Sequence, residues 1–182
     1  MTDPGAHLFW ITSRAAGTAA LLLSSVAVCV GLLIGGRLVR RNGTDLRAVH
    51  EALSLATLVA IAVHGVSLLG DRYLHPGLAD IAIPLASGYQ PLWTSAGIVA
   101  GWATAFLGLS YYARRWIGHQ RWRRMHSLTA LAWALGLVHS LGEGTDASRL
   151  WFEAMAAIVV VPAAALLVAR LVSAGRPALS SR

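Results

Sequence analysis

Five apolar stretches, separated by short segments rich in arginine, set the pattern of the chain. They run over residues 15–36, 52–70, 92–113, 125–142 and 154–169. A helix needs about 20 apolar residues to cross the hydrocarbon core of a bilayer. The first four stretches approach or exceed that length, and the fifth reaches the interfaces if Leu150 or Arg170 extends it, Arg170 through its long side chain. The pattern predicts five membrane-spanning helices, with Pro162 placed to kink the last one.

The composition places nearly all of the chain in the membrane. Of its 182 residues, 56% are hydrophobic and 13% are charged, which is about half the charged share of a soluble domain. All 15 basic residues are arginines that punctuate apolar runs. This excludes a disordered chain, a soluble nucleic-acid-binding protein and a large two-domain enzyme. The one cysteine, Cys29, lies inside an apolar stretch, so neither a disulfide framework nor a cysteine metal site is expected.

The arginines also predict the orientation. Twelve lie in the loops after the first and third stretches and in the C-terminal segment, whereas three lie on the other side: Arg14, Arg72 and Arg149. Because positive charge collects on the cytoplasmic side, we expect the N-terminus outside and the C-terminus in the cytoplasm. The expected protein is an all-α, five-span bundle of the inner (plasma) membrane. It has an outer tail (1–14), a transmembrane domain (15–174) and a cytoplasmic tail (175–182).

The longest loop, residues 71–91, is expected on the outer side. Its centre is apolar at Leu78, Ile81, Ile83 and Leu85. Such a segment suits a short amphipathic piece lying along the membrane interface.

Glycines recur along two of the expected spans. Gly97, Gly101 and Gly108 fall on one stripe of the third stretch, and Gly31 and Gly35 lie in the first. Stripes of small residues usually allow close contact between helices. Room for a bulky cofactor is the alternative.

Four histidines fall inside or at the edge of the expected spans. His50 and His64 belong to the second span, and His126 and His139 to the fourth. These two spans run in the same direction, so His50 and His126 share the cytoplasmic edge, while His64 and His139 share a level nearer the outside. At about 1.5 Å per residue the two levels lie roughly 20 Å apart. Ionisable side chains at membrane depth are rare and are functional candidates.

Two imidazoles that face each other from neighbouring helices suit the axial positions of a haem iron, and such a haem passes electrons. Fourteen residues bring His64 to within about 40° of the face of His50, but thirteen leave His139 about 140° from His126 on an ideal helix. The fourth span is therefore expected to be irregular, or else its two histidines serve groups at different azimuths. Packing histidines or a proton relay in a haem-free protein are the alternatives.

The sequence around these histidines resembles the ferric reductase-like transmembrane domain. This haem-bearing core is shared by ferric reductases, NADPH oxidases and the membrane subunit of the bacterial methionine sulfoxide reductase system. The resemblance is to its short five-span bacterial members, covers about residues 8–172, and rests first on the paired histidines and their spacings. Local motifs add to it: Trp10-Ile11-Thr12-Ser13-Arg14-Ala15-Ala16-Gly17, Ala48-Val49-His50-Glu51, Arg121-Trp122-Arg123-Arg124-Met125-His126 and Val138-His139-Ser140.

The resemblance implies two b-type haems, the inner one held by His50 and His126 and the outer one by His64 and His139. Electrons would pass from the cytoplasmic side outward, to ferric iron, oxygen or a periplasmic reductase.

Arginines near the ligands are candidate partners for the anionic haem propionates. They are Arg47, Arg123 and Arg124 on the inside, and Arg72 and Arg149 on the outside. Alternatively these arginines only set the topology and contact anionic lipid.

Trp133 lies midway between His126 and His139, and Thr57 lies midway between His50 and His64. An aromatic ring between the two haems could assist electron tunnelling, so Trp133 is a candidate for that place. The alternative is a tryptophan that packs in the bundle or faces lipid.

The chain departs from the full-length reductases, which continue into a flavin and nicotinamide domain. It has no glycine-rich phosphate loop after a strand, so we expect it to bind neither FAD nor NADPH by itself. The donor would be a separate cytoplasmic flavoprotein or a membrane quinol, and a periplasmic protein is a candidate acceptor. The chain is therefore expected to be the electron-transfer subunit of an oxidoreductase, bound to membrane lipid and not to nucleic acid. A haem-free scaffold or proton-relay module is the alternative.

Overall fold

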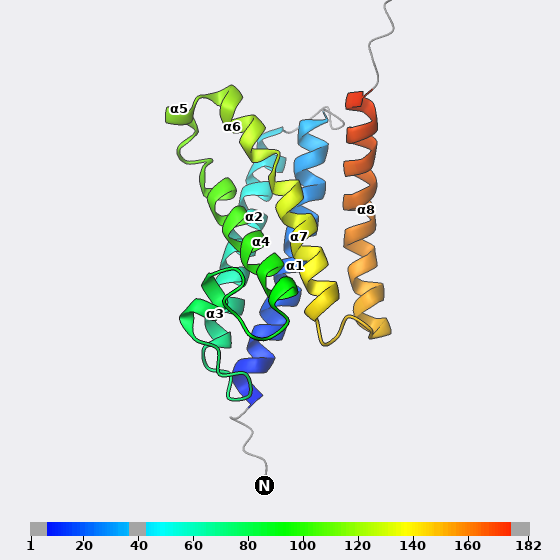
Figure 1. Cartoon of the computed structure of the whole chain (residues 1–182). Coiled ribbons are helices and arrows are strands. Elements are labelled where there is room, and N and C mark those ends of the chain that lie inside the picture. Colours follow the sequence, from blue (N-terminus) through cyan, green and yellow to red (C-terminus); the bar gives the residue numbers. More distant parts are fainter. Residues whose placement is uncertain (1–6, 37–42, 176–182) are drawn as a thin grey trace, which may run out of the picture.

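The computed structural model describes residues 7–36 and 43–175, and within these ranges the protein is all-helical, with no strand. Parts of both expected tails, residues 1–6 and 176–182, lie outside the described residues, as does the segment 37–42 with its expected cytoplasmic arginines. Figure 1 shows the helices gathered into one upright bundle.

Within the described residues, four helices are long and apolar enough to cross a membrane. They are α1 (Leu8–Gly35), α2 (Gly43–Leu68), α4 (Pro91–Leu109) and α8 (Leu150–Gly175). Large apolar side chains such as Val59 and Phe106 are exposed on these helices, as expected where lipid covers the surface. The prediction of a helical membrane protein is confirmed at this level.

The first helix begins earlier than its apolar stretch. Its first residue is Leu8, so residues 8–14 of the expected outer tail are helical. Arg14 interrupts the apolar pattern there, but it forms an ion pair with Asp146 and its guanidinium lies 4.2 Å from the centre of the Trp10 ring. The charge is thus accommodated at the end of the bundle.

The expected fourth span, residues 125–142, is divided into two helices. α6 (His119–His126) ends before a turn at Ser127 and Leu128, and α7 (Thr129–Glu143) has 15 residues. In the turn, the Leu128 N–H donates to the Met125 carbonyl at 3.0 Å, a spacing tighter than that of an α-helix. Because α7 alone is shorter than the bilayer core requires, the described residues form four helices of spanning length where five were expected.

Two short helices lie at opposite ends of the bundle. α3 (Leu78–Ala82) is at the end that holds the start of α1, and α5 (Arg114–Ile117) is beside α6 at the other end (Figure 1). Of the apolar residues at the centre of the longest loop, Leu78 and Ile81 lie in α3, whereas Ile83 and Leu85 follow it. α3 is tied to α4 by the Trp102 Nε1–H, which donates to the Ala82 carbonyl at 2.9 Å.

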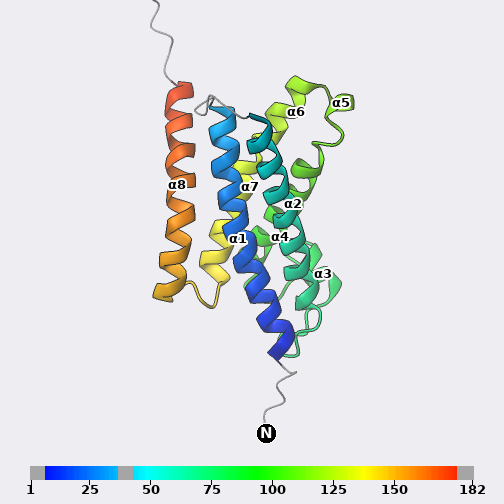
Figure 2. The ribbon, with the colours of Figure 1, turned by 180° about the vertical axis from the view of Figure 1, so that it is seen from behind.

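Helix α1 occupies the middle of the arrangement. It packs along α2 and also contacts α7 and α8, while α4 packs mainly on α7. The views from the two sides agree on this order (Figures 1 and 2). Of the described arginines, three lie at the α3 end, and the rest lie at the end formed by α5, α6 and the close of α8. The asymmetry that predicted the orientation is therefore kept in three dimensions.

Candidate cofactor site: two stacked pairs of histidines

The structure brings together the two pairs of histidines that were expected to share a level in the membrane. The ring centres of His50 and His126 lie 6.1 Å apart with an interplanar angle of 87°. Those of His64 and His139 lie 6.2 Å apart at 67°. The pairs occupy two levels between α2 on one side and α6 and α7 on the other.

The break between α6 and α7 explains how both pairs form. His126 is the last residue of α6, and His139 lies in α7. On one continuous helix these side chains would point about 140° apart. Because the turn at Ser127 and Leu128 separates them, each ring meets its partner on α2, so the structure adopts the irregular alternative.

Each of the four rings is fixed through Nδ1 by a backbone carbonyl of a neighbouring helix. The distances are 3.0 Å for His50 to Ala27, 2.8 Å for His64 to Ser13, 3.4 Å for His126 to Leu107 and 2.9 Å for His139 to Trp93. An Nδ1–H that donates to a carbonyl leaves the lone pair on Nε2, and this outer contact is typical of histidines that bind metals. None of the hydrogen bonds in the described part of the chain uses the Nε2 of these rings.

The separation of the rings fits one metal atom shared by two imidazoles. A metal–imidazole bond is about 2.0–2.1 Å long, and the centre of a ring with bonds of about 1.35 Å lies about 1.1 Å from each ring atom. Two rings on opposite sides of one metal therefore have centres about 6.3 Å apart. The observed 6.1 Å and 6.2 Å are close to that value. No group of three or more His, Cys, Asp or Glu side chains suited to a metal ion occurs in the described ranges, so a metal in either pair would bring its other ligands with it.

Glycines allow three of the rings to lie directly against a neighbouring helix. A Cβ atom at Gly31 would lie 3.0 Å from His50, and one at Gly17 would lie 3.0 Å from His64. At Gly97 it would lie 2.7 Å from both Cε1 and Nδ1 of His139. Gly17 and Gly31 have the same spacing as the two histidines of α2 because α1 and α2 pack side by side. Some of these glycines therefore make room for a histidine ring in addition to allowing close contact between helices.

A buried layer separates the two levels. Trp133, Thr57 and Ser25 are 7%, 2% and 0% exposed. The Trp133 Nε1–H donates to Ser25 Oγ at 3.0 Å, and that hydroxyl donates to the Leu21 carbonyl at 2.7 Å. The polar groups of Trp133 and Ser25 are therefore satisfied within the protein. Sequence reasoning had placed Trp133 and Thr57 midway between their histidines but missed Ser25, since a lone serine in an apolar run carries no signal of its own.

The Trp133→Phe substitution is expected to lower the stability of the bundle. It removes the donor to Ser25 and leaves space where the larger ring packed, a combined cost of about 1–3 kcal/mol. Thermal unfolding in one detergent measures the effect. Trp116→Phe is the matched control because Trp116 is 75% exposed. Equal melting temperatures for the two variants would contradict the assigned role of the buried layer.

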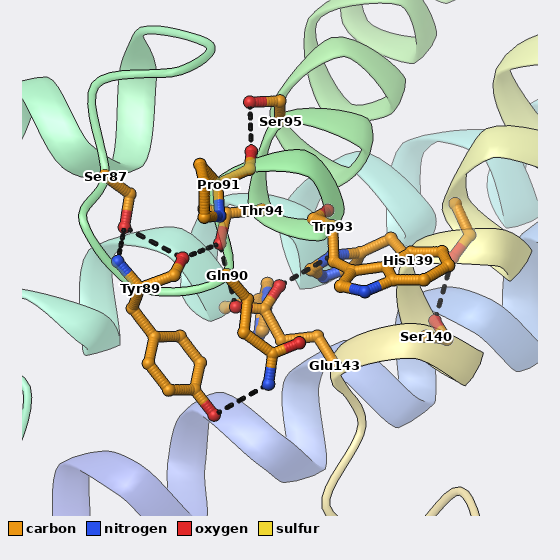
Figure 3. Close-up of polar contacts among 12 residues, drawn as sticks. Ser87, Tyr89, Gln90, Pro91, Trp93, Thr94, Ser95, His139, Ser140 and Glu143 are labelled. Atoms are coloured by element: carbon orange, nitrogen blue, oxygen red, sulfur yellow. Dashed lines mark hydrogen bonds and ion pairs between the residues drawn. The ribbon is translucent and has the colours of Figure 1, made fainter.

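A carboxylate beside the outer pair was missed by sequence reasoning. Glu143 Oε2 lies 3.1 Å from His139 Nδ1, and Glu143 Oε1 accepts a hydrogen bond from Thr94 Oγ1 at 2.9 Å (Figure 3). The sequence does contain a signal for this contact: Glu143 is four residues after His139, a spacing that brings two side chains together on one face of a helix.

The inner pair has a tryptophan beside it. The Trp122 ring stacks on His126 with centres 5.0 Å apart and an interplanar angle of 24°. Its Nε1–H is buried without a hydrogen-bond partner in the described structure. Buried polar groups in folded proteins nearly always have a hydrogen-bond partner, so this donor points to a ligand at the site. An anionic group beside the inner pair would satisfy it.

The arginines chosen as partners for an anionic group are on the surface. Arg47, Arg72, Arg123, Arg124 and Arg149 are all exposed. None of the side-chain contacts seen within the described ranges joins Arg47, Arg123, Arg124 or Arg149 to a paired histidine. The donor beside the inner pair that is available to an anionic group is the Trp122 Nε1–H, not an arginine.

Comparison with known proteins finds no relative of the chain. No family model matches the chain, and no curated protein or solved structure shows significant similarity to it. The functional argument therefore rests on the residues and their geometry.

Proposed function

We propose that the chain is the transmembrane electron-transfer subunit of an oxidoreductase of the ferric reductase-like type. His50 and His126 would hold an inner b-type haem, and His64 and His139 an outer one. The observation that carries the proposal is the shared geometry of the pairs. Their ring centres are 6.1 Å and 6.2 Å apart, and all four Nδ1 atoms are engaged by carbonyls.

The residues around the pairs suit this cofactor. Haems held by the two histidine pairs would supply one-electron redox centres. The carbonyls of α1 and α4 hold the imidazoles in the tautomer that presents Nε2. Trp122 Nε1, which has no partner in the described structure, would donate to an anionic group of a haem held at His126. Trp133, buried and hydrogen-bonded to Ser25, puts an aromatic ring in the layer between the two levels.

The divided helix supports a fifth crossing. α7 packs against α1 and α4, both of which are long enough to span the bilayer. In this proposal α6 and α7 together, residues 119–143, complete the crossing, with the basic α6 at the interface.

The direction of electron flow follows from the proposed orientation. With the N-terminus outside and the arginine-rich end in the cytoplasm of a cell's inner membrane, the outer pair faces the acceptor side. A negative-inside potential favours an outward electron by about 2.3 kcal/mol per 100 mV. The arginines of α5 and α6, Arg114, Arg115, Arg121, Arg123 and Arg124, suit an acidic flavoprotein as donor, with a membrane quinol as the other candidate. Ferric iron, oxygen or a periplasmic reductase would accept the electron.

The test is a visible spectrum of the detergent-purified protein before and after dithionite, with quantitation of haem as the pyridine haemochrome. We expect two low-spin b-type haems per chain. A protein that stays colourless after expression with added haem would overturn the proposal, and a haem-free scaffold or proton relay would then be the better interpretation.

A further inference from the structure

The outer pair differs from the inner pair by one carboxylate. Glu143 is the last residue of α7, one turn beyond His139, and its Oε2 lies 3.1 Å from the ring Nδ1. In the described part of the chain, His139 is the one paired histidine with a carboxylate oxygen at such a distance. His50, His64 and His126 have backbone carbonyls at Nδ1, and His64 also has the Ser13 hydroxyl at 3.0 Å.

Glu143 is held in place from α4. Its Oε1 accepts the bond from Thr94, and the preceding residue, Trp93, offers its carbonyl to His139 Nδ1 at 2.9 Å. Figure 3 shows Trp93 from the start of α4 and Glu143 from the end of α7 beside the His139 ring, with Thr94 in contact with Glu143. Two consecutive residues of one helix thus position both the ligand and its carboxylate.

The second oxygen of this carboxylate, Oε2, takes no part in the hydrogen bond with Thr94. Glu143 Oε2 is buried, and its one close polar neighbour in the described structure is His139 Nδ1 at 3.1 Å. A buried carboxylate oxygen is costly unless positive charge compensates it. An imidazole bound to an oxidised metal carries such charge next to this oxygen.

A negative charge beside Nδ1 has a defined electronic effect. It increases the electron donation of the imidazole to the metal and stabilises the oxidised, more positive centre over the reduced one. The effect is larger in a low-dielectric interior than in water. Hydrogen bonds and charges around axial ligands are among the means by which proteins set haem potentials.

We propose that Glu143 is a positioning residue for His139, whose carboxylate lowers the reduction potential of the outer haem and has no counterpart at the inner one. This rests on the proposed function. The outer centre would thereby be a stronger one-electron reductant than its ligands alone would make it, which suits an acceptor that is hard to reduce.

The test is a redox titration of the Glu143→Gln variant of the full chain, followed by its visible spectrum. We expect two haems per chain and an upward shift of one midpoint potential. Repeating the substitution in a His50→Ala background, which retains only the outer haem, should show the same shift. In a His64→Ala background, which retains only the inner haem, it should show none. Glu153→Gln is the matched control, since it removes an exposed acid at the same end of the bundle.

Unchanged potentials in Glu143→Gln, with two haems present, would overturn the inference and leave the proposed function intact. Absence of haem from the wild-type chain would instead overturn the proposed function. If Glu143→Gln loses the outer haem, Glu143→Asp decides. Retention of that haem by the aspartate variant supports a role for the charge, whereas loss from both variants overturns it.

Discussion

Replacing His139 with alanine is expected to reduce the haem content from two per chain to one. The variant removes one of the two imidazoles that would hold the proposed outer haem, and His64 alone would remain. The inner pair lies roughly 20 Å away along the helices and shares no side chain with the outer one. Pyridine haemochrome quantitation against protein concentration measures the loss.

The reciprocal variant distinguishes pairing from general damage. His50→Ala is expected to remove the inner haem and keep the outer one, so the two single-haem proteins should differ in midpoint potential. The control is His75→Asn, at a loop histidine with a φ of 44°, because asparagine tolerates this left-handed backbone better than alanine does. It should keep two haems. Retention of both haems in His139→Ala would contradict the pairing.

The Gly97→Ala substitution is expected to damage the outer centre almost as strongly as loss of the ligand. Its Cβ would lie 2.7 Å from Cε1 and Nδ1 of His139, closer than real contacts allow, so the imidazole must move. Movement breaks the bond to the Trp93 carbonyl and changes the distance to His64. We expect about half of the haem to be lost, or one haem to change from low to high spin as its axial ligand is withdrawn.

Gly101→Ala provides the matched control on the same helix. A Cβ at that position would lie 3.4 Å from a methyl group of Ile61, an ordinary contact, and alanine is the better helix former. This variant should keep two low-spin haems and the wild-type melting temperature. A Gly97→Ala protein with the same spectrum as Gly101→Ala would show that the close approach to His139 is not required.

Sequence patterns were sufficient to predict α4 and the central parts of α1, α2 and α8, but not the full lengths of these three helices. The bilayer requires long uninterrupted apolar helices, and that requirement acts on each segment separately. The levels of the four histidines followed for the same reason, since rise along a helix depends only on residue number. Arg14 concealed the true start of α1, because its charge is compensated by Asp146, which is 132 residues away in sequence.

Only the tertiary structure decided how the histidines are held. The division of the fourth stretch into α6 and α7, the carbonyls that fix each Nδ1, and the contact of Gly97 with His139 all depend on the relative rotation of neighbouring helices. The place of Glu143 beside the outer ring and of Trp122 beside the inner one depends on it as well. Periodicity within one segment carries no information about that rotation, because it is set by side-chain packing between helices.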